Sequence, residues 1–186
     1  MFNDTDSVDI ATVGATSGIL TGNPGTGGSV TITAGGLLTV SQPISTAQPS
    51  DATATGSISL IGFVQVNGTI TSGGGNVSLT GTTTGNSDLT VNSALTSGGD
   101  VTLSAPRDAF INAVISTIGA NADITIIADS DVSGSGGALV TATGGLSAIA
   151  TVALRGSSGV SATFNNNGVG TGVGFTLPAP LTTVAV

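Results

Sequence analysis

The chain lacks most of the side chains on which enzymes rely. Its 186 residues include no Glu, Lys, His, Cys, Tyr or Trp, so every acidic residue is an Asp. General acid–base chemistry and activated nucleophiles usually depend on His, Lys, Cys or Glu. The absence of Cys also excludes disulfides and thiol redox chemistry. The composition therefore favours a protein without catalytic activity and without a redox cofactor.

Charge is scarce and mostly of one sign. Ten Asp against two Arg give a net charge of -8, only 6% of the residues are charged, and five Phe are the only aromatic residues. Such a chain cannot neutralise a row of phosphates and has no stacking platform for bases, so we expect no nucleic-acid partner. No apolar run reaches the roughly 18 residues of a spanning helix, so we expect no membrane insertion.

Gly, Ser, Thr and branched aliphatic residues make up much of the remainder, and they follow a repeated phrase. It reads G-N-V-S-L-T-G at 75–81, G-D-V-T-L-S-A at 99–105 and A-D-I-T-I-I-A at 122–128. Its anchors Val77, Val101 and Ile124 are 24 and 23 residues apart. A repeat of this length predicts a solenoid, in which each unit buries its apolar face only by stacking on the next.

The alternation within each phrase predicts the fold class: an all-β, right-handed parallel β-helix with coils of about 19–28 residues. Val77 and Leu79 should point inward, and Asn76 and Ser78 outward. Leu89, Val91 and Leu95 should line the next wall. The predicted core ladder consists of two neighbouring rows of aliphatic residues, namely Val30, Ile58, Val77, Val101 and Ile124 in one and Leu79, Leu103 and Ile126 in the other.

Breaks in the pattern indicate how the single domain is divided. Residues 1–27 are either an irregular N-terminal segment or the first coil, and 28–155 hold the β-helix repeats. Pro43 and Pro49 interrupt them, which predicts an inserted loop at 41–55. Residues 156–186 are predicted to form a terminal coil and a C-terminal strand. The best helix candidate, 109–118, is rich in β-branched residues and interrupted by Asn112, so no helix is expected.

Asp100 and Asp123 are the only candidates for a metal site. With Asn76 they occupy the same place in successive phrases, directly before the anchor strand. A ladder of such oxygens can bind Ca²⁺. The alternative, which the residue types favour, is that Asp and Asn side chains hydrogen-bond to the backbone of the turn. We therefore expect no catalytic residue, no cofactor site and no metal site, with calcium as the one exception to test.

Other polar groups are weaker candidates. Asp129 and Asp131 form a pair of acids of the kind found in polysaccharide hydrolases, but a solvated corner is the favoured interpretation. Asp108 beside Arg107 is expected to be an exposed ion pair of little energetic weight. Four Thr-x-Thr pairs do not recur at one place in every coil, which argues against an ice-binding face; they are Thr31/Thr33, Thr53/Thr55, Thr82/Thr84 and Thr141/Thr143.

Large aromatic residues are rare enough to be considered individually. Phe63, Phe110, Phe164 and Phe175 lie in or near the repeated phrases. They are expected to fill the core or the corners and not to form a platform for sugar stacking.

The phrases at 75–81 and 99–105, with D-L-T-V-N-S-A-L-T-S-G-G between them, resemble repeats of filamentous-haemagglutinin-type exoproteins over about residues 28–155. These are large adhesins of the two-partner and autotransporter secretion routes. The resemblance implies a non-enzymatic structural segment of a bacterial adhesin, extracellular or on the cell surface, that acts as a stiff rod. Adjoining repeats and host or matrix glycans are the implied partners. The alternative is a subunit of a self-assembling extracellular filament, in which copies join end to end by strand addition.

Overall fold

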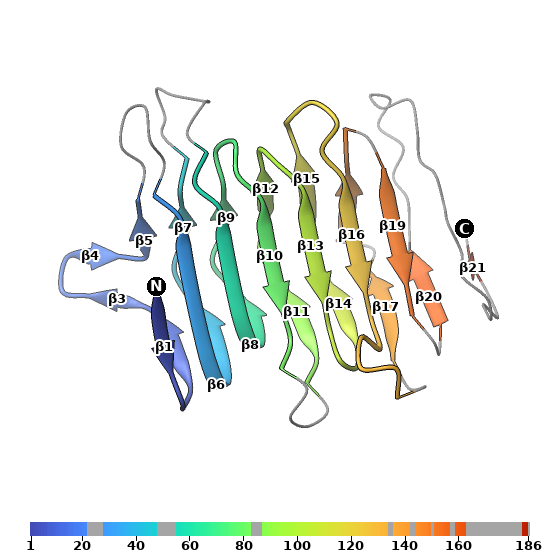
Figure 1. Ribbon diagram of the computed structural model, residues 1–186, viewed down its shortest axis with the longest axis horizontal. Coiled ribbons are helices and arrows are strands. Elements are labelled where there is room, and N and C mark those ends of the chain that lie inside the picture. Colours follow the sequence, from blue (N-terminus) through green and yellow to red (C-terminus); the bar gives the residue numbers. More distant parts are fainter. Residues whose placement is uncertain are drawn as a thin grey trace.

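The computed structural model describes residues 1–21, 28–47, 55–82, 87–133, 136–141, 144–149, 151–156, 159–162 and 184–185. Within these residues every regular element is a β-strand, and the strands stack in parallel along one axis (Figure 1). Among the described strands, the one antiparallel pair is a small hairpin of β3 (Thr12–Val13) and β4 (Thr16–Ser17). The predicted all-β parallel β-helix is confirmed.

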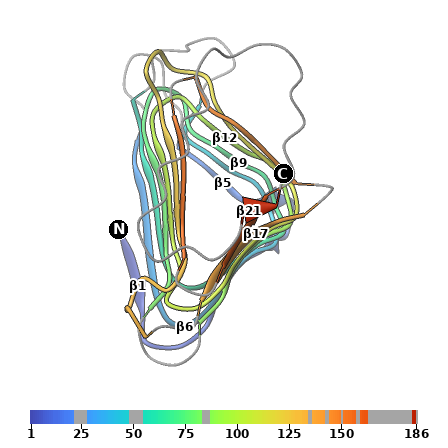
Figure 2. The ribbon, with the colours of Figure 1, turned by 90° about the vertical axis from the view of Figure 1, so that its right-hand side faces the viewer.

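Each coil from β1 to β18 contributes a strand to each of three walls, and Figure 2 looks along the stack at their outline. The first wall contains β1 (Phe2–Asp4), the first halves of β6 (Val30–Val40) and β8 (Ile58–Val66), β10 (Val77–Thr80), β13 (Val101–Ser104), β16 (Ile124–Ile127) and β19 (Val152–Arg155). The second wall contains β2 (Val8–Ile10), the second halves of β6 and β8, β11 (Leu89–Val91), β14 (Ala109–Ile111), β17 (Gly137–Val140), β20 (Gly159–Ala162) and β21 (Val184–Ala185). The third wall contains β5 (Ile19–Leu20), β7 (Ile44–Ser45), β9 (Ile70–Thr71), β12 (Leu95–Ser97), β15 (Val114–Thr117) and β18 (Gly145–Ser147).

Strand alternation places the aliphatic residues inside. Val77 pairs in register with Ile58 on one side and with Val101 on the other, and Leu79 pairs with Leu103. Nearly all members of the predicted ladder are fully buried, with at most 6% of any side chain exposed. β-branched residues suit these rows because they pack well on a pleated surface. The rows form one continuous apolar core through the centre of the solenoid.

Two segments differ from the sequence-based expectation. Ile44–Ser45, which falls in the predicted inserted loop 41–55, forms β7 and pairs with β5 and β9 inside the third wall. Ile44 is buried. Pro43 can lie next to this strand because it precedes β7 and so does not interrupt the hydrogen bonding of the strand. Residues 48–54 of that loop lie outside the described part of the chain. Leu95 belongs to the third wall and not to the wall of Leu89 and Val91, because residues 92–94 turn a corner between them.

The N-terminal segment, for which two possibilities were open, is a coil. β1 and β2 both pair in parallel with β6, and β5 pairs with β7, so the first 20 residues contribute to all three walls. In the terminal region 156–186, the described strands β20 and β21 pair with each other, and β20 also pairs with β17. The remainder of that region lies outside the described residues.

Candidate functional site

A row of polar side chains runs along the corner just before the first wall. The backbone N–H of Asp100 donates to Oδ1 of Asn76 at 3.0 Å, that of Asp123 donates to Oδ1 of Asp100 at 3.0 Å, and that of Thr151 donates to Oδ1 of Asp123 at 2.9 Å. The same contact links Ser57 to Ser29 and Asn76 to Ser57. We call these residues the slot row: Ser29, Ser57, Asn76, Asp100, Asp123 and Thr151.

The side chains of the slot row accept hydrogen bonds from backbone N–H groups that have no partner in the strand pairing. The carbonyl oxygen of Asp100 already accepts the N–H of Val77, one coil earlier, at 2.9 Å. Its own N–H has no strand partner at that point, and the side chain of the preceding coil supplies the acceptor. Asp100 and Asp123 thus hydrogen-bond to the backbone, as the favoured interpretation predicted, but the N–H that each accepts belongs to the following coil and not to its own turn. No group of three or more His, Cys, Asp or Glu side chains that could hold a metal ion occurs in the described part of the chain.

A second row uses the same device before the second wall. Oδ1 of Asp88 accepts the N–H of Asp108 at 3.3 Å, and Oδ1 of Asp108 accepts the N–H of Gly137 at 2.9 Å. Arg107 binds Asp88 through two contacts, Nε to Oδ1 at 2.7 Å and Nη2 to Oδ2 at 2.5 Å. Its contact with Asp108 is longer, at 3.3 Å.

The main partner of Arg107 is therefore Asp88, from the preceding coil, and not its sequence neighbour Asp108. The hydrogen bond from Asp88, followed by its charge, raises the pKa of the Arg107 guanidinium above its ordinary value. A two-pronged contact between guanidinium and carboxylate fixes both side chains in one geometry. The ion pair links two neighbouring coils and has a structural role that the sequence did not predict.

Asp129 and Asp131 lie in the turn that follows β16. Oδ1 of Asp129 accepts the hydroxyl of Ser133 at 2.8 Å, and Oδ1 of Asp131 accepts the N–H of Ser133 at 3.1 Å. Asp131 is exposed, but Asp129 is buried, so the predicted solvated corner is wrong for Asp129. Both carboxylates bind Ser133 in the turn.

Two further polar ladders were not predicted from the sequence. Asn67, Asn92 and Asn112 stack after the second wall. The amide nitrogen of Asn92 donates to Oδ1 of Asn67 at 2.9 Å, and that of Asn112 donates to Oδ1 of Asn92 at 2.8 Å. Inside the third wall, buried hydroxyls bind corner carbonyl oxygens, as Ser72 does to Gly75 at 2.6 Å and Thr117 to Ala122 at 3.1 Å. Strand alternation could have revealed the buried hydroxyls, because Ser72 lies two residues after Ile70 and therefore points inward as Ile70 does.

The outer face of the first wall carries a row of hydroxyls, which the Thr-x-Thr pairs do not reveal. One outward position is Ser or Thr in five successive coils: Thr31, Ser59, Ser78, Thr102 and Thr125. Thr31/Thr33 is the only one of the four Thr pairs whose two residues both lie in a described strand. Among the described residues these five hydroxyls have no hydrogen-bond partner, so the wall presents an uncharged, hydrogen-bonding surface to solvent.

Phe63 and Phe110 do not fill the core. Both lie at outward positions of the second wall and are half-buried, because the inward positions beside them belong to Val64 and Ile111. Phe63 pairs with Leu37 and Phe110 with Leu139, so the outer surface of this wall is partly apolar. Phe164 and Phe175 lie outside the described residues.

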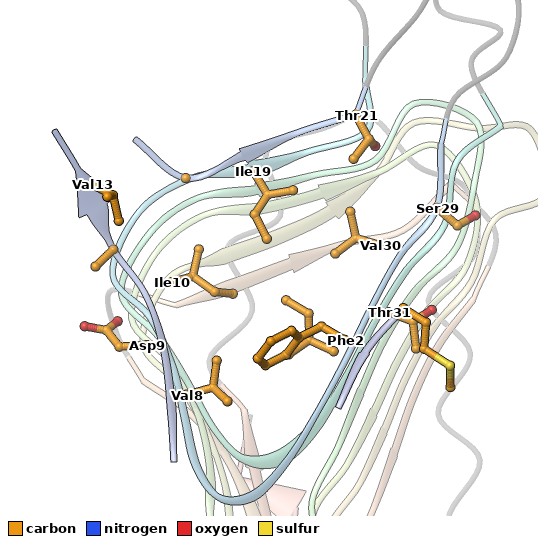
Figure 3. Close-up of a pocket in the computed structure, with 14 residues that line it drawn as sticks. Phe2, Val8, Asp9, Ile10, Val13, Ile19, Thr21, Ser29, Val30 and Thr31 are labelled. Carbon is orange, nitrogen blue, oxygen red and sulfur yellow. The ribbon is translucent and has the colours of Figure 1, made fainter. Parts of the chain in front are cut away.

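The N-terminal end of the solenoid is hollow. A cavity of about 450 Å³ opens there between the three walls of the first coil (Figure 3). Phe2, Ile10 and Ile19 point into it, whereas the carboxylate of Asp9 points away. The apolar interior of the core thus reaches the surface at this end.

No protein-family model, curated protein or solved structure matches the chain. The described residues include no helix long and apolar enough to span a membrane.

Proposed function

We propose that this chain is a non-enzymatic structural segment of a bacterial adhesin or surface exoprotein. It acts outside the cell as a stiff rod that extends or presents neighbouring regions. The resemblance of its repeats to filamentous-haemagglutinin-type exoproteins supports this proposal, and so does the scarcity of catalytic side chains.

The observation that carries the proposal is the continuous register along the first wall. Five first-wall pairings in succession, from β6 to β19, keep aliphatic residues opposite aliphatic residues. Between them the slot row, the Asn ladder and the Arg107–Asp88 pair use side chains to bind one coil to the next. A stack whose neighbours are held by both backbone and side-chain bonds resists bending, which is the property that a spacer requires.

Rigidity and location test the proposal together. We expect negatively stained particles of the purified chain to be straight, and we expect the described coils to resist a broad-specificity protease under native conditions. Antibodies against the folded chain should label intact cells of the source organism without permeabilisation. Flexible particles, rapid digestion within the walls or labelling only after lysis would each contradict it.

A second function, a subunit of a self-assembling extracellular filament, is favoured by the hollow N-terminal end. An exposed strand edge beside an apolar interior is a template for a further strand. Electron microscopy separates the two functions, since a spacer gives single short particles and a filament subunit gives long fibres.

A further inference from the structure

We propose that the outer face of the first wall binds ice, through a two-dimensional array of hydroxyl and methyl groups that continues from β6 to β16. This inference goes beyond the proposed structural function and does not depend on it. The ligand is identified by its chemistry: ice is an uncharged, repeating lattice of hydrogen-bonding groups, which a repeating, uncharged wall can match along two directions.

The array consists of two rows, because each strand of this wall turns alternate residues toward solvent. The first row contains Thr31, Ser59, Ser78, Thr102 and Thr125, and the second, two residues further along each strand, contains Thr33, Ile61, Thr80, Ser104 and Ile127. We call the two rows together the hydroxyl array. Every position in it is Thr, Ser or Ile, so it offers hydroxyl and methyl groups and no charge. It ends at β19, where Ala153 and Arg155 occupy the two positions.

The spacing of the hydroxyl array follows from the strand pairing. Successive coils lie about 4.8 Å apart, and the two rows lie about 6.6 Å apart because each residue of a parallel strand rises about 3.3 Å. The strands are side by side and nearly parallel (Figure 1). The register shift between β6 and β8 falls after Thr33 and therefore outside the array. The wall thus presents a regular grid whose repeats are close to those of water molecules on the faces of an ice crystal.

The hydroxyls of the array do not hold the fold together. Within the part of the chain that the structure describes, none of them has a hydrogen-bond partner. Other polar rows are engaged within the protein: Thr96 lies 3.3 Å from Ser116 in the third wall, and the slot row and the Asn ladder bind the neighbouring coils. The donors and acceptors of the hydroxyl array are therefore available to water, and the strands hold them at fixed places.

The side chains of the array favour ice over other repeating ligands. The array has no aromatic residue that could stack on the sugars of a polysaccharide, and no charged residue that could bind an anionic surface. The nearest carboxylates, of Asp100 and Asp123, lie in the slot row at its margin and accept backbone N–H groups. Each hydroxyl can hold one water molecule in place, while the methyl groups beside it are covered by ordered water that can join a lattice without losing hydrogen bonds.

Uptake into growing ice tests the proposal with the full-length chain. The chain has no Lys, so an amine-reactive dye labels the N-terminus alone. A single ice crystal that grows slowly in a dilute solution excludes solutes that do not bind to it. We expect the crystal to incorporate the labelled chain, and we expect its fluorescence to be confined to particular crystal faces, because a grid matches only the faces that share its repeats.

Two matched substitutions locate the binding face. Thr102→Arg, in the centre of the hydroxyl array, should abolish uptake, because a long charged side chain holds the lattice away from the wall. Thr96→Arg makes the same change at an outward position of the third wall and should leave uptake unchanged. Circular dichroism verifies that both variants keep their β signal. Ser78→Thr adds a methyl group to the array and should increase uptake, a gain that a folding defect cannot produce.

Three outcomes would overturn the proposal. The first is exclusion of the unmodified chain from the ice, and the second is an equal effect of Thr102→Arg and Thr96→Arg on uptake. The third is binding to insoluble chitin or cellulose without uptake into ice, which would assign the wall to a carbohydrate. None of these outcomes bears on the rod, since straight and protease-resistant particles are expected whether or not the wall binds ice.

Discussion

Two kinds of corner join the first wall to the second. In β8 the chain turns at the single residue Gly62, and the strand continues on both sides of the bend. In later coils the strand is interrupted, as between β13 and β14, where the corner consists of residues 105–108. The walls on either side are the same in both cases, with the same inward rows.

The difference shows two ways in which the chain can turn from the first wall to the second. A turn of one residue needs no extra polar contacts, but it needs backbone geometry that only Gly adopts readily: Gly62 has a φ of 152°, and a Cβ there would lie 3.1 Å from the carbonyl oxygen of Gly36. A longer corner accepts ordinary residues but must bind its own backbone groups. The Asp88–Arg107–Asp108 cluster binds such a backbone group in the corners that precede β11 and β14, where Asp88 accepts the N–H of Asp108. The first solution depends on space and the second on electrostatics.

The largest effect on stability should come from a substitution outside the corners, in the buried core between the walls. Val101→Asp places a carboxylate in a fully buried row, which should cost more than about 4 kcal/mol and unfold or aggregate the chain. Thr102→Asp, one residue along and facing solvent, should change the free energy of unfolding little. Urea denaturation of both variants tests this, and similar behaviour of the two would show that the assigned register is wrong.

Gly62→Ala tests the single-residue corner. The positive φ and the close oxygen atoms of Gly36 and Ala34 should lower the free energy of unfolding by roughly 1–3 kcal/mol. Gly145→Ala is the matched control, since the nearest atom to its added Cβ, a methyl of Val114, is 3.7 Å away. Denaturant midpoints of the two variants should differ clearly. If they were equal, the tight bend would not depend on glycine.

Asp88→Ala tests the longer corner. It removes both contacts to Arg107 and the acceptor for the N–H of Asp108. Since the Arg107 side chain is 38% exposed and solvent screens the pair, we expect only a small loss of stability, less than that of Gly62→Ala. The loss should shrink in 1 M salt, because part of it is electrostatic. Asp6→Ala, at an exposed position, is the control, and thermal melts at both salt concentrations provide the measurement.

Val132 should permit a stabilising change in another long corner. It has a φ of 59° and is almost fully exposed, so a β-branched residue occupies a left-handed conformation without any packing in return. Val132→Asn should raise the free energy of unfolding by about 0.5–1 kcal/mol, because Asn tolerates this region better. The tight corner at Gly62 offers no comparable gain, since glycine already suits its backbone. A lower melting temperature for Val132→Asn would contradict the assigned backbone conformation.

The smallest effect is expected in the slot row, which is the same in coils with either kind of corner. Asp123→Asn keeps the Oδ1 acceptor for the N–H of Thr151, so stability should change by less than about 0.5 kcal/mol.

Neither EDTA nor added Ca²⁺ should shift the melting temperature of the unmodified chain. A large drop on adding EDTA, reversed by Ca²⁺ and absent from the Asp100→Ala, Asp123→Ala double variant, would show that the row binds metal.

The sequence was sufficient to predict the walls because strand alternation and repeat spacing are local. Val77, Val101 and Ile124 could be aligned by their phrases alone, and their register in the structure follows that alignment. The polar slot was also recognisable, since Asn76 and Asp100 occupy the same place in each phrase.

The corners could not be predicted in the same way. The pairing of Arg107 with Asp88 depends on how two corners of different length are superimposed, which no spacing rule specifies. Strand β7 was missed because two residues are too few to show alternation, and only its neighbours in adjacent coils reveal it. The hollow end is a property of stacked coils and has no signature in any single phrase.

The slot row also gives the solenoid a direction. In each step the side-chain oxygen belongs to the earlier coil and the N–H to the later one, from Ser29 through to Thr151. A finished coil thus displays a ready acceptor to the segment that follows it in the chain. Since each coil contacts only its immediate neighbours, order can propagate one coil at a time. A polypeptide delivered with its N-terminus first can therefore fold progressively, each completed layer serving as the template for the next.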